Sequence, residues 1–294
     1  MAHDELLTYY VAPGVFTAVA NFATQVDALA NDVEAIARAV QGLLIHEALA
    51  PAYQVVLPDD RVGEKQLHSA EAMLACATRL NAQPITEARV PAQRVGGVCR
   101  HFATMFVAFM RHKGVPARAR CGFANYFEPG KHVDHWVGEY WNASELRWVL
   151  VDAQIDDLQR RLFHLNIDTL DVPRDRFLVA GDAWRACRSG ADPMTFGVAG
   201  TKMWGLVEVF GDVFQDLAAL QNIELLPWGW YGLALDDSAV SDVELIDELA
   251  RLSSTANANA LTALRKMVDA DERLRVPAST VEAIVAADRA GIAA

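Results

Sequence analysis

Apolar positions in the N-terminal part of the chain repeat in steps of three and four residues, the period of a helix that buries one face. Over residues 17–49 the repeat comprises Val19, Phe22, Val26, Leu29, Val33, Ile36, Val40, Leu43 and Leu44. It predicts one helix that Pro51 stops, because proline cannot continue the helical hydrogen-bond ladder. Residues 69–80 predict a second helix, with Ser69 as its N-cap.

A buried helix is predicted for residues 99–113, where Gly114 and Pro116 end the apolar repeat. The pattern then changes to short segments rich in aromatic and β-branched residues, separated by the turn sequences Glu-Pro-Gly and Asn-Ala-Ser. These segments are 117–126, 133–141 and 146–151. They predict an antiparallel strand meander, in which we expect Arg118 to make a structural ion pair.

Helical spacing returns after the strands, in the segments 175–187, 201–221, 242–252, 258–268 and 279–290. Helices, then strands, then helices indicate an α+β fold rather than alternating α/β. With 294 residues the chain is long enough for one large domain or two modest ones. We expect one unit over residues 1–170 and a helical C-terminal region over 171–294, which is either a separate lobe or a wrapping around the first.

Composition and charge narrow the classes of function. Hydrophobic residues make up 52% of the chain and charged residues 22%, which is typical of globular proteins. The net charge of −12 argues against nucleic acid or an anionic membrane as a partner and favours a peptide, a protein or a small molecule. The sequence leaves the oligomeric state open.

The chain carries no uninterrupted apolar stretch long enough to span a membrane, and residues 1–14 lack the basic and apolar regions of a signal peptide. Its four cysteines, Cys76, Cys99, Cys121 and Cys187, form no C-x-x-C pair. We therefore expect a cytoplasmic protein with reduced thiols.

Three segments combine residue types that suit nucleophilic catalysis. Cys99 follows two glycines at the start of a predicted helix, where free N–H groups and the helix dipole stabilise a thiolate and lower the thiol pKa. His135 falls on the second predicted strand, and Asp152 ends the third. If these strands are neighbours, the carboxylate orients the imidazole to accept the thiol proton.

Each residue also has a plainer interpretation. Cys99 can be a small core residue, His135 a packing residue with one hydrogen bond, and Asp152 a turn or cap residue. What favours catalysis is that all three occur in order, each in the structural setting that its role requires.

A metal site is a further alternative, built from His132, Asp134 and His135 with Cys99 or Cys121. Side chains alternate along a strand, so a His-x-x-His pair does not place both rings on one face. The sequence offers no second compact ligand pair to close a zinc site. We therefore expect neither a metal nor an organic cofactor.

The ordered segments resemble the transglutaminase-like superfamily, a branch of the papain-like cysteine enzymes. The resemblance covers residues 95–154 and is carried by Gly97-Val98-Cys99, Gly114-Val115-Pro116-Ala117-Arg118, His135-Trp136-Val137 and Trp148-Val149-Leu150-Val151-Asp152. It implies a papain-like core in which the helix that bears the nucleophile packs on an antiparallel sheet. It also implies that Cys99 is the nucleophile, His135 the general base and acid, and Asp152 the orienting carboxylate. After His135 the chain reads Trp-Val-Gly-Glu-Tyr, where family members usually read Ala-Trp-Val-Glu-Val-Tyr.

Two details of the expected site stay open. The Cys99 backbone N–H is one natural oxyanion donor, and Gln93 is either a second donor or a solvated loop residue. The aromatic segment 226–232 is either core packing or a wall over the thiol.

The first functional hypothesis is acyl transfer or amide hydrolysis through a thioester on Cys99, acting on a peptide, a protein or a small acyl or amide substrate. The alternatives are a biosynthetic amide-forming or cyclising acyltransferase and a catalytically silent binding module of the same fold. The sequence does not distinguish water from an amine as the acyl acceptor.

Overall fold

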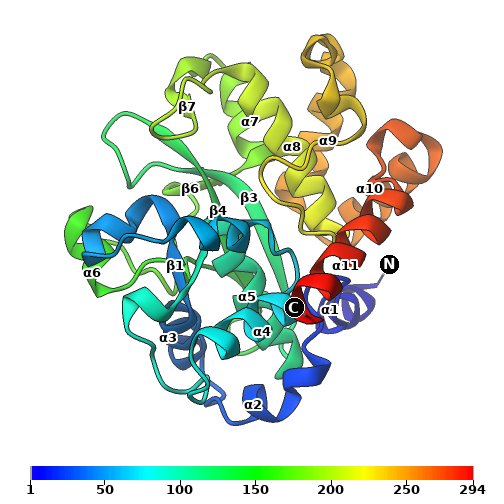
Figure 1. Cartoon of the computed structure of the whole chain (residues 1–294). Helices are drawn as coiled ribbons and strands as arrows, with labels where there is room; N and C mark the ends of the chain where they lie inside the picture. The colour runs from blue at the N-terminus through cyan, green and yellow to red at the C-terminus, as the bar shows by residue number, and fades with distance from the viewer. Residues whose placement is uncertain (1, 294) are drawn as a thin grey trace.

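The computed structural model describes residues 2–293 and is built around a five-stranded sheet (Figure 1). Its strands are β3 (Ala117–Ala124), β4 (His132–Asn142), β5 (Arg147–Val151), β6 (Phe177–Val179) and β7 (Phe196–Gly197). The order is β5-β4-β3-β6, with all these pairs antiparallel, and β7 joins the start of β4 in parallel. The predicted meander and the α+β class are confirmed.

Helix α5 (Cys99–His112) packs against β3 and β4, as the buried apolar pattern of residues 99–113 predicted. The helix approaches the sheet so closely that a Cβ on Gly138 would lie 2.3 Å from Cδ1 of Phe106. Only glycine fits at this point of β4. The close packing fixes the start of α5, and therefore Cys99, relative to the sheet.

The prediction of a single helix over residues 17–49 is wrong. The chain instead forms α2 (Ala23–Asp27), α3 (Val33–Leu43) and the short strand β1 (Leu44–His46). Asp32 restarts the helix by accepting a hydrogen bond from the Ala35 N–H, and β1 leaves the helical repeat to pair in parallel with β2 (Val95–Gly97). This pairing joins segments about 50 residues apart, which local periodicity does not reveal.

The remaining helices are α1 (His3–Val11), α4 (Ala70–Leu80), α6 (Asp157–Leu162), α7 (Ala180–Arg188), α8 (Leu206–Leu220), α9 (Val243–Thr255), α10 (Ala258–Ala270) and α11 (Ala278–Ala293). Short 3₁₀ turns lie at Ala20–Phe22, Glu47–Tyr53, Asp59–Gln66, Pro91–Gln93, Pro193–Thr195, Gly232–Leu235, Asp237–Ser241 and Glu272–Leu274. Ser69 caps α4 as predicted, through its hydroxyl and the Ala72 N–H. A helix was predicted for residues 175–187, but Phe177–Val179 form strand β6, because they pair with β3, and helix α7 begins only at Ala180.

Helix α8 packs against β3 and supplies a buried acid to that strand. The Asp216 carboxylate accepts from the Cys121 backbone N–H at 3.1 Å and from both the Nε and Nη2 of Arg120. Arg118 pairs with the buried Glu139 at 2.5 Å, which confirms the predicted ion pair. These charged contacts tie α8 and β4 to β3.

Two large hydrophobic clusters flank the sheet. One joins α3, α4 and α5 to the sheet, and the other joins α1 to α7, α8, α9 and α10. In Figure 1 the blue α1 accordingly lies beside the orange helix α10. The boundary expected at residue 170 stays a prediction; β6 and β7, from beyond it, belong to the same sheet as β3 to β5. Within residues 2–293, no helix combines the length and apolarity needed to cross a membrane.

Candidate active site

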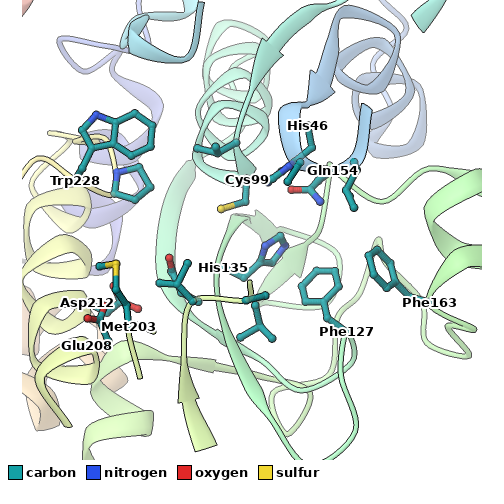
Figure 2. A pocket seen from close by; sticks show the side chains of 18 of the residues that line it. His46, Cys99, Phe127, His135, Gln154, Phe163, Met203, Glu208, Asp212 and Trp228 are labelled. Carbon is teal, nitrogen blue, oxygen red and sulfur yellow. The ribbon is translucent and has the colours of Figure 1, made fainter. Parts of the chain in front are cut away.

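Cys99 is the first residue of α5, directly after β2 and Val98. Gly97 allows this sharp entry, since a Cβ there would lie 2.8 Å from the ring of His101. That ring in turn accepts the Val98 N–H through Nδ1 at 3.1 Å and takes the place of a capping side chain. Cys99 is 7% exposed, and its thiol points into a cavity (Figure 2).

Burial raises the pKa of the Cys99 thiol well above its ordinary value, and the nearby charges of Asp134 and Asp152 act in the same direction. The backbone N–H groups of Trp136 and Arg100 point at the sulfur and oppose the rise. The lowered pKa expected from the helix N-terminus is therefore wrong for the free protein, because desolvation outweighs these donors. The resting thiol is neutral.

His135 and Asp152 lie in direct contact, as expected for the ends of neighbouring strands. His135 Nε2 lies 2.9 Å from Asp152 Oδ2. A carboxylate only accepts hydrogen bonds, so Nε2 carries the proton and Nδ1 is left as an acceptor. The same Oδ2 accepts from the Tyr126 hydroxyl at 2.7 Å, and Oδ1 accepts from the Gln154 N–H at 3.1 Å. These three donors hold the carboxylate in one orientation.

The cavity that contains Cys99 and His135 has a volume of about 450 Å³. Aromatic side chains form much of its wall, and the described residues that line it include no lysine or arginine. In Figure 2, Phe127 and Phe163 lie at one end and Asp212, Glu208 and Met203 near the other, with Cys99 and His135 between them. The segment 226–232 contributes Pro227, Trp228 and Trp230, which favours its interpretation as a wall.

His46 and Gln154 also line the cavity, although the sequence did not single them out. β1 places His46 beside Gly97, two residues before Cys99. Burial and the neighbouring His135 lower the pKa of His46 to about 4, so its ring is neutral near pH 7. Within residues 2–293, no group hydrogen-bonds to its Nδ1. His46 stands alone in a segment predicted as helix, so no spacing in the sequence marks it.

Gln93 is not part of the cavity. It is exposed in a 3₁₀ turn, where its Oε1 accepts from Asn81 Nδ2 at 2.7 Å. Of its two open interpretations, the structure supports the solvated loop residue.

Asp134, Asp212 and Cys121 come together at the acidic end of the cavity. One potential ligand atom from each lies within 4.8 Å of the others. Burial raises the pKa of Asp134 to about 6 and that of Asp212 well above its ordinary range, and Asp134 further raises the pKa of Asp212. Asp212 and Asp216 stand four residues apart in the mainly apolar C-terminal part of α8, a pattern that marks buried acids.

Comparison with known protein families points to the segment that contains Cys99, His135 and Asp152. Residues 75–153 match the family model of the transglutaminase-like superfamily. The match confirms the resemblance seen in the motifs and supports cysteine-based catalysis in general. No curated protein matches the chain.

Among solved structures, a proposed cysteine protease from Cytophaga hutchinsonii is similar at 16% sequence identity, with a TM-score of 0.34. The similarity covers 61% of this chain and 46% of that one, so this chain spans less than half of that protein.

The transglutaminase-like segment contains Cys99, His135 and Asp152 but not the whole cavity. His46 precedes the segment, and Asp212 and Trp228 follow it. Part of the cavity wall therefore comes from segments of the chain that the family model does not match.

Proposed function

We propose that the protein is a cysteine-dependent acyltransferase or amide hydrolase that works through a thioester on Cys99. The observation that carries the proposal is the pairing of His135 Nε2 with Asp152 at 2.9 Å at the edge of the cavity that holds the thiol. This pairing leaves Nδ1 of His135 as a base, and a silent binding pocket has no need of it.

In the proposed first step, the Cys99 sulfur attacks the acyl carbon while its proton passes to His135 Nδ1. A neutral resting thiol fits this order, because the proton leaves as the carbon–sulfur bond forms. The tetrahedral intermediate then collapses to the thioester, and the imidazolium returns the proton to the departing amine. Water or an amine completes the cycle, with His135 accepting its proton.

Two donors are available to the oxyanion of the intermediate. The Cys99 backbone N–H, at the first position of α5, has no partner within the helix. The neutral His46 ring supplies an N–H from the adjacent strand β1. The Cys99 N–H is the donor expected from the sequence, and in this proposal His46 rather than Gln93 is the second donor.

A library of amide, ester and thioester acyl donors tests the proposal, with intact-protein mass spectrometry to detect an acyl adduct. We expect an adduct on Cys99 that disappears in Cys99→Ala. It should persist in the matched control Cys187→Ala, which removes a half-buried thiol on α7 outside the cavity. An adduct that survives Cys99→Ala would refute the assignment of the nucleophile.

The raised pKa of the Cys99 thiol favours a second candidate, a binding module that keeps the fold without turnover. Such a module would hold a ligand in the cavity and give no adduct with any donor class. Binding of a donor to wild-type protein without acylation, and with equal affinity in Cys99→Ala, would identify it.

A further inference from the structure

The acidic end of the cavity contains two carboxyl groups that the proposed acyl transfer does not use. Asp134 precedes His135 on β4, and Asp212 lies on α8, which packs on the neighbouring strand. Asp212 is only 7% exposed and lines the cavity. Across the described part of the chain, Oδ1 of Asp134 and Oδ2 of Asp212 have no hydrogen-bond donor. Buried carboxylate oxygens without a donor are costly and rare in proteins.

None of the described residues that line the cavity is a lysine or an arginine, and His135 is the group whose charge lowers the pKa of Asp134. Arg120 is engaged by Asp216 and Glu139, and the titratable groups that share the cavity with the pair are His46, His135, Glu208 and Cys99. Cys121, from β3, completes the surroundings. The pair therefore shares the cavity with a third acid, two imidazoles, the Cys99 thiol and the Gln154 amide, among lining residues that are mostly apolar.

Aromatic surface lies next to the pair. The Trp230 ring lies against Gly211, the residue before Asp212, so closely that a Cβ at Gly211 would come within 2.3 Å of it. Trp230 also lines the cavity. Buried carboxylates in a cavity that also has an aromatic lining are a favourable environment for an organic cation and an unfavourable one for an anion.

We propose that Asp134 and Asp212 form a subsite that binds a positively charged nitrogen of the substrate, a primary ammonium, beside Cys99. The inference rests on the proposed acyl transfer and states which class of substrate that reaction would prefer. Cys99 and His135 lie between this subsite and the apolar end formed by Phe127 and Phe163. The substrate is therefore a molecule with its reacting carbonyl between a cationic and an apolar portion. The ammonium belongs either to the acyl donor or to an amine acceptor.

Matched alkylating agents test the subsite without knowledge of the natural substrate. The probes are N-(2-aminoethyl)-2-chloroacetamide, its neutral isostere N-propyl-2-chloroacetamide, and the acidic N-chloroacetyl-β-alanine. In each, the Cys99 sulfur displaces chloride and the thiol proton passes to His135. We expect the ammonium probe to alkylate Cys99 about 10-fold faster than the propyl probe, and the acidic probe to be the slowest. Equal rates for all three would overturn the subsite, whereas failure of all three to alkylate Cys99 would count against the proposed function.

Variants connect the preference to the two acids. Asp212→Asn and, separately, Asp134→Asn should reduce the ratio of ammonium to propyl rates to within about 2-fold of unity. The control Glu208→Gln removes a half-buried charge one turn earlier on α8 and should keep most of the preference. An unchanged ratio in both Asn variants, or an equal loss in Glu208→Gln, would overturn the proposal. Both rates in the ratio are measured on the same protein, so a general loss of reactivity cancels. Thermal unfolding verifies that each variant is folded.

Two further measurements show whether the ammonium belongs to the acyl donor or to the acceptor, and whether a shared proton or a metal occupies the subsite instead. Butylamine and 1-butanol are titrated against free protein and against protein capped on Cys99 with the propyl probe. Tighter binding of the amine to capped protein indicates an acceptor; tighter binding to free protein alone indicates an acyl donor. No preference in either form would identify a proton-sharing structural pair and overturn the proposal. A stoichiometric divalent metal in purified protein, held by Asp134, Asp212 and Cys121, would overturn it as well.

Discussion

Replacing Asp152 with asparagine tests the orientation of His135 with little change of shape. The carboxylate accepts three hydrogen bonds, from His135 and Tyr126 on Oδ2 and from the Gln154 N–H on Oδ1. An asparagine oxygen in the Oδ2 position would leave its amide N–H₂ facing the Gln154 donor. The opposite orientation satisfies Gln154, and its N–H₂ then donates to His135 Nε2 and to the Tyr126 oxygen. This second orientation is favoured, and it moves the imidazole proton to Nδ1.

A proton on Nδ1 removes the base that Cys99 needs, so the variant should fold but lose most of its rate. In triads of this kind, the wrong tautomer lowers turnover by about 10²–10⁴-fold. The assay is turnover of wild type, Asp152→Asn, His135→Ala and the double variant with the best acyl donor found. Circular dichroism verifies folding, and alkylation of Cys99 by N-propyl-2-chloroacetamide gives an independent rate. The losses in the double variant should not add, because the residues act as one unit.

A wild-type rate in Asp152→Asn would refute this reasoning and require another group to orient His135. Glu139 is unsuited to that role, because Arg118, Arg120 and Arg174 all engage its carboxylate. Asp134 would then be the remaining acid to test.

Four further predictions follow from the same geometry. Cys99→Ala should abolish turnover yet unfold within about 1 kcal/mol of wild type; retained turnover, or a larger loss in urea denaturation, would contradict this. Alkylation of free Cys99 by iodoacetamide should be slow at pH 6 and still rise above pH 9.0, because burial raises the thiol pKa; fast labelling at pH 6 would instead reveal a thiolate paired with imidazolium. Glu139→Gln should lower the free energy of unfolding by about 3–5 kcal/mol, since Arg118 and Arg120 would lose a buried partner; a urea midpoint near that of wild type would refute it. Chelators should leave turnover unchanged; zinc lost together with activity would mean that Cys121 and its acidic neighbours hold a metal.

Local signals in the sequence predicted the elements that carry or adjoin Cys99, His135 and Asp152. The apolar repeat and the Gly114–Pro116 stop predicted α5, which ends at His112, and the turn sequences separated β3, β4 and β5. Such features depend on residues a few positions apart, so one sequence suffices to find them. The assignment of Cys99, His135 and Asp152 came from the order of motifs, and the contact of His135 with Asp152 agrees with it.

The tertiary structure decided what depends on distant partners. β1 leaves a helical repeat to pair with β2, and β6 forms where a helix was predicted, because strand pairing outweighs local propensity. The same long-range packing brings His46 and Asp212 to the cavity from outside the family segment. It also raises the pKa of the Cys99 thiol, where the position at the helix start had predicted a lowered pKa. Desolvation depends on every element that covers the thiol and not only on the helix that bears it.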